Sequence, residues 1–218
     1  MKKTRPRTKP ADVRREEIMD AAERLFLTNG VAATPIDDVA AGAEVAKGTV
    51  YLHFASRQAL LAGLGERFAE RHLACIKAAI AACAETDWAG KLAAWAEASV
   101  AFYLDSIELH DMLFHEARTP TREGLVDNLS TDHLTSLLNA GATAGAWSVD
   151  DARFTAVFLF SGMHGIVDDA FLKEKRIAKV RSVKVRSVKV RLVKGRLTRR
   201  LRSVCFRTVG LQYDDTCR

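Results

Sequence analysis

Apolar residues near the start of the chain recur at the spacing of α-helices. Between positions 14 and 29 they stand three or four residues apart, which predicts a helix with one buried stripe. The residues of this stripe are Ile18, Ala21, Ala22, Leu25 and Phe26. Two short helices are predicted next, at 35–41 and 46–52, joined by a turn at 42–45. Ser56 is expected to cap a fourth helix that begins at Arg57.

The pattern remains helical as far as residue 172. Further helices are predicted at 87–108, 107–117, 122–139 and 151–172, with a looser stretch between Gly141 and Gly145. No segment shows sustained alternation of apolar and polar residues, so strands are not expected. No apolar run reaches the roughly 18 residues that cross a membrane. The fold class is therefore predicted to be all-α.

The segment 180–194 differs from the rest, because it reads VRSVK, VRSVK, VRLVK. Its valines stand alternately three and two residues apart. This spacing does not place them on one face of a helix, nor on one face of a strand. We therefore predict no packed structure for this repeat. Helical spacing returns from Val193 through Leu197, Leu201 and Val204, with arginines between them, which indicates a short basic amphipathic helix.

The net charge of +6 is unevenly distributed along the 218 residues. Residues 1–15 hold seven basic side chains and one acidic one, and residues 173–218 hold sixteen and three. Contacts with polyanions are therefore expected at the two ends of the chain. The four cysteines form no CxxC pair and are expected to be reduced thiols. The basic start is not followed by an apolar stretch, so a cytoplasmic protein is expected.

The third helix and its continuation carry the most informative residues. Positions 45–61 read VAKGTVYLHFASRQALL, while 18–26 and 34–40 read IMDAAERLF and TPIDDVA. These sequences resemble those of the TetR family, in which the motif G-T-[LV]-Y-x-[HY]-F ends the recognition helix and the motif S-[KR]-x-x-L begins the next helix. The resemblance covers residues 14–64. It implies an N-terminal three-helix helix-turn-helix DNA-binding domain, followed by a helical-bundle regulatory and dimerisation domain.

The resemblance also implies a function, namely a transcriptional repressor that binds a palindromic operator in double-stranded DNA as a homodimer and is released by a small-molecule effector. The expected parts of the chain are a basic flexible arm at 1–13, the DNA-binding domain at 14–64, an effector-binding and dimerisation domain at 65–172, and an atypical basic tail at 173–218. The arm either follows the DNA or is a solvated tail. Its basic residues are Lys2, Lys3, Arg5, Arg7 and Lys9.

A recognition helix in the major groove needs a thin, polar leading edge. The candidate DNA-contacting residues are Thr34, Ala46, Lys47, Gly48, Thr49, Tyr51, His53 and Arg57. Gly48 costs a helix roughly 1 kcal/mol relative to alanine, which a close approach to DNA explains. Lys47 and Thr49 can reach base edges or phosphate, Tyr51 and His53 can donate to phosphate oxygens, and Thr34 and Arg57 stand beside helix starts that hold phosphates. The core behind them is predicted to contain Val39, Ala40, Val45, Val50, Leu52 and Phe54.

Two residues of this frame depart from the family pattern, and each candidate contact also has a plain alternative. Glu44 stands where the family often has glycine in the turn, and Ala46 stands where it often has a capping serine. Taken singly, Lys47 and Arg57 fit solvated charges, and Tyr51 fits a partly buried aromatic residue. Their joint placement in one short frame favours contact with DNA.

By the resemblance, the region from about 66 to 172 holds an effector and pairs with a second subunit. Large side chains there suit either an apolar effector cavity or a plain core. The effector candidates are Trp95, Phe102, Tyr103, Phe114, His115 and Trp147. Helix 151–172 is favoured as the subunit interface, because Ser161, Gly162 and Gly165 permit close approach beside Phe158 and Ile166. In the family a further helix completes this interface, and here the VRSVK repeat takes its place without a coherent apolar face.

Other functions stay open. His110 and His115 near Asp111, and His164 four residues before Asp168, have the spacing of metal ligands, which leaves a metal-sensing regulator of the same fold open. The basic tail leaves open a membrane-surface protein or a nonspecific nucleic-acid binder. The sequence has no nucleophile motif and no glycine-rich phosphate loop, so neither enzymatic activity nor a cofactor is expected.

Overall fold

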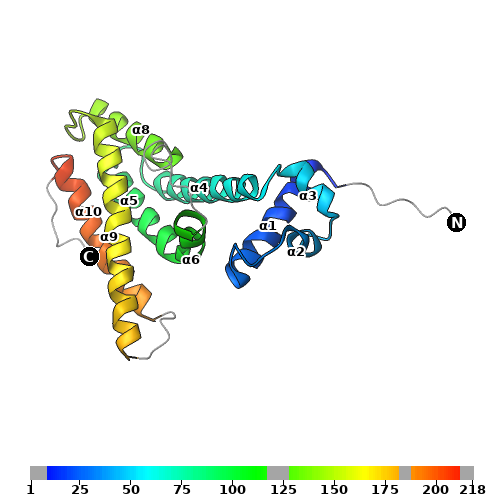
Figure 1. The fold of residues 1–218 in the computed structure, drawn as a ribbon. Coiled ribbons are helices and arrows are strands. Elements are labelled where there is room, and N and C mark those ends of the chain that lie inside the picture. Colours follow the sequence, from blue (N-terminus) through cyan, green and yellow to red (C-terminus); the bar gives the residue numbers. More distant parts are fainter. Residues whose placement is uncertain (1–8, 117–127, 182–187, 212–218) are drawn as a thin grey trace. The chain divides into compact units, whose positions relative to one another are not determined.

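The computed structural model describes residues 9–116, 128–181 and 188–211. The described residues form helices and no strand, so the prediction of an all-α fold is confirmed (Figure 1). The chain divides into two compact units. Unit 1 comprises residues 1–68 and 108–119, and unit 2 comprises residues 69–107 and 120–218.

Unit 1 begins with three helices and the first part of a fourth. They are α1 (Ala11–Asn29), α2 (Ile36–Gly42), α3 (Lys47–His53) and α4 (Arg57–Ala81), and α6 (Ile107–His110) and a π-helical turn η1 (Asp111–Glu116) follow later in the chain. α1 packs on α2, and α2 packs on α3. α1 starts three residues earlier than predicted, directly after Pro10, which has no N–H to leave unpaired at a helix start. As predicted, Ser56 caps α4 by accepting a hydrogen bond from the Ala59 N–H at 3.1 Å.

Unit 2 contains the second part of α4 and four further helices. They are α5 (Trp88–Asp105), α8 (Leu129–Thr143), α9 (Ala152–Arg181) and α10 (Val188–Thr208). α5, α9 and α10 lie side by side, and α8 packs on α9 (Figure 1). The side chains of Asp87 and Asn128 cap α5 and α8. The core between these helices is apolar and includes the fully buried Trp95, Leu134, Leu138, Leu159 and Met163.

The stretch between Gly141 and Gly145 leaves the helix and is exposed at 143–145, as predicted, but its first residue is packed. α8 continues to Thr143, and Gly141 within it is buried. A Cβ at Gly141 would lie 2.0 Å from the ring of Trp147, and the indole N–H of Trp147 donates to the carbonyl of Leu138 at 2.8 Å. Gly141 is therefore required by the close approach of an aromatic ring.

The described part of the basic tail also differs from the prediction, because it is part of the core. Positions 182–187 lie outside the described residues, but α10 packs against α5. Its buried side chains Leu197, Leu201 and Cys205, together with Val209 directly after the helix, recur every four residues. Burial raises the pKa of the Cys205 thiol to about 12. The amphipathic helix indicated by the sequence is present but longer, because apolar positions beyond the repeat supply its buried stripe.

α9 is apolar on two sides. Its residues Ala152–Lys173 are long and apolar enough to cross a membrane by length and composition, and they form the one such helix in the described chain. Ala156, Met163 and Val167 face the core of unit 2, whereas Phe154 and Phe158 are 70% and 55% exposed. α9 is therefore a core helix that also presents a second apolar face.

Candidate nucleic-acid interface

α3 has one side packed into unit 1 and one side exposed. The sequence predicts six core residues in and around α3. Of these, Val39, Ala40, Val50 and Phe54 are buried and Val45 is half-buried. The prediction for Leu52 is wrong, because this side chain is 85% exposed. Leu52 follows Val50 by two residues, which in a helix of 3.6 residues per turn places it about 160° away, on the opposite side.

The predicted leading edge lies together on the exposed side. α3 begins after Ala46, whose side chain cannot cap it, as predicted. Lys47 and Gly48 are exposed, Tyr51 is 45% exposed, and Thr49 is half-buried. Nothing in the described chain lies within 4 Å of a Cβ built at Gly48, so packing inside the protein does not require this glycine. An approach of another surface from outside does explain it.

Lys47 is held in place by the neighbouring helix. Its Nζ lies 2.8 Å from Oδ2 of Asp37 in the first turn of α2. The hydrogen bond and then the charge of Asp37 raise the pKa of Lys47 above its ordinary value. Lys47 is thus a firmly protonated donor at the outer edge of α3.

Thr34 and Arg57 lie behind the exposed side of α3. Thr34 is fully buried, and its hydroxyl donates to the carbonyl of Gly30 at 2.8 Å. Arg57 donates through Nη2 to the carbonyl of Thr34 at 2.7 Å and through Nη1 to the carbonyl of Val31. The structure therefore uses both side chains to tie the connection between α1 and α2 to the start of α4.

His53 closes α3 and is half-buried. Its carbonyl accepts a hydrogen bond from Nη1 of Arg15 at 3.4 Å, and the Arg15 guanidinium lies 4.3 Å from the ring centroid of Phe54. The sequence reasoning missed Arg15, because its partners stand 38 and 39 positions further along the chain. Arg15 fixes the end of α3 against α1.

Arg67, also missed, anchors α4 to α1. Its side chain is 8% exposed and donates to Glu16 at 3.1 Å, Asp20 at 2.7 Å and Glu23 at 2.6 Å. Burial lowers the pKa of Arg67, but the three hydrogen bonds outweigh it and raise the pKa. Because acidic residues on a helix face usually indicate a solvated surface, the sequence offered no signal for this cluster.

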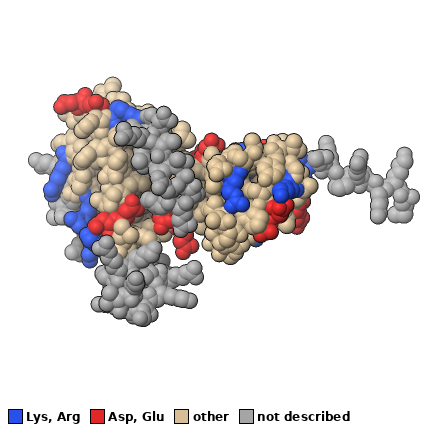
Figure 2. Space-filling model, in the orientation of Figure 1, with Lys and Arg blue, Asp and Glu red and all other residues tan. Residues whose placement is uncertain are grey.

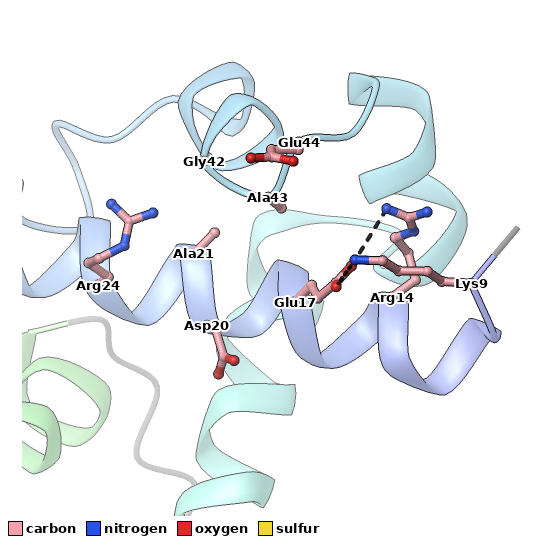
Figure 3. A pocket seen from close by; sticks show the side chains of 9 residues that line it. All are labelled: Lys9, Arg14, Glu17, Asp20, Ala21, Arg24, Gly42, Ala43 and Glu44. Atoms are coloured by element: carbon pink, nitrogen blue, oxygen red, sulfur yellow. Dashed lines mark hydrogen bonds and ion pairs between the residues drawn. The ribbon is translucent and has the colours of Figure 1, made fainter. Parts of the chain in front are cut away.

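A polar pocket of about 460 Å³ lies between α1 and the end of α2 (Figure 3). The side chains of Lys9 and Arg14 point toward Glu17 in it, and both pair with that carboxylate. Glu44 stands at its edge with a φ of 55°, the left-handed conformation that favours glycine. This backbone conformation gives the physical reason why the family often has glycine at this position.

The exposed surface of unit 1 does not carry a uniform basic field. Figure 2 shows basic side chains next to acidic ones on this unit. Residues 1–8, which hold Lys2, Lys3, Arg5 and Arg7 of the predicted basic arm, lie outside the described part of the chain. Within the described part, the exposed side of α3 therefore offers individual polar groups, and the face drawn in Figure 2 carries no uniform basic patch.

The predicted effector residues fall into different places. Trp95, Tyr103 and Trp147 are buried in unit 2, and Phe102 is half-buried there. Phe114 is exposed and belongs to unit 1, while the side chain of His115 lies outside what the structure describes. The hydroxyl of Tyr103 donates to Oδ1 of Asp168 at 2.6 Å. Four of the six candidates are thus brought into one unit.

A buried histidine that the sequence did not single out lies beside Phe102. The rings of His72 and Phe102 stack with centroids 5.1 Å apart, and His72 Nδ1 lies 3.0 Å from the hydroxyl of Ser130. Burial, and then the charge of His164, lower the pKa of His72 to about 4. Within the described residues, His72 Nε2 has no hydrogen-bond partner, and neither have Trp95 Nε1 and Ser99 Oγ. Buried polar atoms of this kind mark places where a ligand or water completes the site.

Three observations on the described residues concern the alternatives of metal sensing and membrane binding. No three His, Cys, Asp or Glu side chains among them gather as metal ligands would. His164, one of the sequence candidates, contacts the carbonyl of Phe160 through Nδ1 at 2.9 Å. The described part of α10 buries its apolar face against α5, whereas a membrane-surface helix inserts that face into lipid.

Known proteins similar to this chain share its N-terminal sequence. The sequence profile of "Bacterial regulatory proteins, tetR family" matches residues 18–64. The HTH-type transcriptional regulator YerO of Bacillus subtilis is 44% identical over 48 residues, and TtgR of Pseudomonas putida is 40% identical over 58 residues. These matches cover 22% and 27% of this chain, and the chain spans 17% and 28% of the length of those proteins.

Solved structures extend the similarity to the whole fold. The fatty acid degradation regulator FadR from Bacillus halodurans superimposes with a TM-score of 0.64 at 19% sequence identity. The alignment covers 98% of this chain and 100% of that chain. At this identity the likeness shows that the two chains share a fold.

Proposed function

We propose that this chain, which matches the TetR family of bacterial regulatory proteins over residues 18–64 and shares the fold of its solved members, is a cytoplasmic transcriptional repressor. In this proposal α3 binds the major groove of a palindromic operator, two subunits bind two half-sites about one helical turn apart, and a small molecule releases the complex. The observation that carries the proposal is the exposed side of α3, where Lys47, Gly48 and Tyr51 face outward while Val50 and Phe54 hold the helix in place.

In this proposal, the exposed residues of α3 have two different roles in binding DNA. Lys47 and Tyr51 flank the outermost line of α3 and present an ammonium and a hydroxyl, which suit phosphate oxygens or acceptors on base edges. Ala46 and Gly48 supply no bulk, so the helix can lie deep in the groove. Thr34 and Arg57 contribute indirectly, because they hold the segments on either side of α3.

The proposal is tested by selecting duplexes from a random library with the purified protein and then measuring affinities. Lys47→Ala and Tyr51→Ala are expected to weaken binding to the selected operator by about tenfold or more, equal to about 1.4 kcal/mol. Lys77→Ala, which removes the same charge from an exposed position on α4, serves as the control. A protein that binds no duplex at low ionic strength contradicts the proposal.

We place the subunit interface on the second apolar face of α9. Phe154 and Phe158 project from it, and the neighbouring Gly162 and Gly165 are exposed, with no other part of the described chain within 4 Å of a Cβ built at either glycine. Small and large side chains next to each other on one face allow two helices to pack closely. Apolar side chains exposed together in this way mark an interaction surface.

Phe158→Glu is expected to convert a dimer into a monomer in sedimentation velocity experiments, because two carboxylates would be buried against each other. Thr143→Glu, at an exposed position of α8, is the matched control and should remain dimeric. The same monomeric variant should lose most of its affinity for the palindrome, since only one half-site would be contacted.

We place the effector beside His72 in unit 2. The neutral imidazole of His72 lies against the ring of Phe102, and the buried Ser99 hydroxyl and Trp95 indole N–H, on the same helix as Phe102, can offer further hydrogen bonds. This combination suits a small uncharged molecule with an aromatic ring and an oxygen acceptor. A library of such compounds is tested for release of the operator, and the response of the protein to an active compound should be lost in His72→Phe but kept in His133→Phe.

A further inference from the structure

Leu52 is the most exposed of the large apolar side chains in the described chain, at 85%. It lies in α3, a helix of only seven residues. The inward direction of this helix is set by Val50, which is 1% exposed. Gly48 and Leu52 each stand two residues from Val50, so both lie about 160° around the helix from it. These two residues therefore form the outermost line of α3.

We propose that Leu52 determines sequence specificity by packing against the C5-methyl group of a thymine in the operator. The inference deepens the proposed function and rests on it. In the major groove thymine alone presents a methyl group, and an aliphatic side chain has no polar atom with which to read any other base. Gly48, one turn earlier on the same line, lets the helix approach closely enough for Leu52 to reach a base edge.

Leu52 differs from its exposed neighbours on α3 in chemistry and in position on the helix. Lys47 and Tyr51 have polar ends and stand on one flank of the outermost line, and Lys47 is oriented by Asp37 at 2.8 Å. Charged and hydroxyl groups at the flank suit the phosphates that border the groove, whereas the apolar group on the central line faces the base pairs. Burying Leu52 against a methyl group removes apolar surface of both groups from water, which adds affinity that a polar base edge does not provide.

The experiment replaces single thymines of the selected operator by deoxyuridine, which removes only the methyl group. In one half-site, one such replacement is expected to weaken binding of the unmodified protein about fourfold, which corresponds to about 0.8 kcal/mol for one methyl group. Leu52→Ala should bind the natural operator more weakly and should no longer distinguish thymine from deoxyuridine at that position. Leu27→Ala, at an exposed position of α1, should retain the full discrimination.

The outcomes separate this inference from the proposed function. If the protein binds its operator but deoxyuridine at every thymine position weakens the unmodified protein and Leu52→Ala equally, Leu52 reads no methyl group and the inference is overturned. The same holds if Leu52→Ala binds the operator as tightly as the unmodified protein. If no duplex is bound at all, the proposed function itself fails. Circular dichroism of Leu52→Ala confirms that the exposed substitution leaves the fold intact.

Discussion

Unit 1 and unit 2 are both built from helices, yet different interactions hold them together. In unit 1, arginines reach across the structure: Arg15 to the end of α3, Arg57 to the connection between α1 and α2, and Arg67 to three carboxylates of α1. In unit 2, large apolar side chains such as Trp95 and Leu201 fill a continuous core. α2 and α3 have seven residues each, and one side of α3 stays exposed, so these helices bury few apolar groups.

The comparison teaches that a unit of short helices with one side of α3 exposed relies on polar anchors between its helices. The unfolding of the two units can also be followed separately, because their tryptophan content differs. All three tryptophans, Trp88, Trp95 and Trp147, lie in unit 2. Tryptophan fluorescence therefore follows the unfolding of unit 2, whereas far-UV circular dichroism follows both units.

The largest effect is expected where the core of unit 2 is opened at α10. Leu201→Ala should lower the free energy of unfolding by roughly 3 to 4 kcal/mol, because a fully packed leucine leaves a cavity. The urea midpoint measured by tryptophan fluorescence should fall accordingly. Val204→Ala, on the exposed side of the same helix, should change it by less than about 0.5 kcal/mol. Equal effects of both substitutions would contradict the packing of α10 into the core.

The next effect is a pH dependence that belongs to unit 2. Because the pKa of His72 is about 4 in the folded chain and 6.5 ordinarily, the unfolded chain binds a proton between these pH values that the folded chain does not. The free energy of unfolding should therefore fall as the pH is lowered from 6.5 to 4, by about 3 kcal/mol in total. Below pH 4 this group has no further effect.

His72→Phe isolates this contribution. The variant keeps an aromatic ring beside Phe102 but has no group to protonate, so its stability should decline less steeply over the same pH range. Urea titrations followed by tryptophan fluorescence at several pH values give the difference between the two proteins. Parallel pH profiles would show that His72 titrates normally and is not buried as described.

The two units also differ in how far the sequence predicted them. The three N-terminal helices could be predicted because the evidence for them is local: the turn at 42–45 and the sequence motif of α3 stand within about twenty residues. Leu52 was misplaced because a helix of seven residues has too few positions for periodicity to show which apolar residue faces inward. The outward placement of Lys47 and Tyr51 followed from the motif, but the burial of Thr34 depends on its bond to Gly30.

The polar anchors and the site around His72 could not be predicted, because their partners are distant in the sequence. Arg67 meets carboxylates 44 to 51 positions away, and His72 meets a serine 58 positions away. A pattern of apolar and polar residues records which side of a helix is buried and not which polar group lies opposite. α10 was predicted only in part: the spacing of Leu197 and Leu201 indicated an amphipathic helix, but nothing in the sequence showed that this helix packs against α5.

A smaller effect is expected when an anchor of unit 1 is removed. Arg67→Met should destabilise unit 1 by about 2 kcal/mol, below the roughly 3 to 5 kcal/mol of a fully buried ion pair because Glu16 and Asp20 are themselves exposed. The transition followed by circular dichroism should shift more than the one followed by fluorescence. Arg24→Met, at an exposed position of α1, is the control. A shift confined to tryptophan fluorescence would refute the role of Arg67 in unit 1.

The smallest effect concerns the turn before α3, and it tests whether the backbone of unit 1 carries strain. Glu44 has a φ of 55°, which costs a residue with a side chain about 1 kcal/mol relative to glycine. Glu44→Gly should therefore raise the stability of unit 1 by about 1 kcal/mol, visible in circular dichroism and absent from tryptophan fluorescence.

A second glycine, introduced three residues earlier, makes the test specific for the conformation of the turn. Ala41→Gly lies in the exposed helical part of α2 and should lower stability by about 1 kcal/mol, because glycine loses more conformational freedom in a helix than alanine does. The two substitutions thus add the same residue to neighbouring positions with opposite expected signs. If both destabilise the protein, Glu44 stabilises the turn through its side chain, and unit 1 depends on one more polar anchor than the arginines provide.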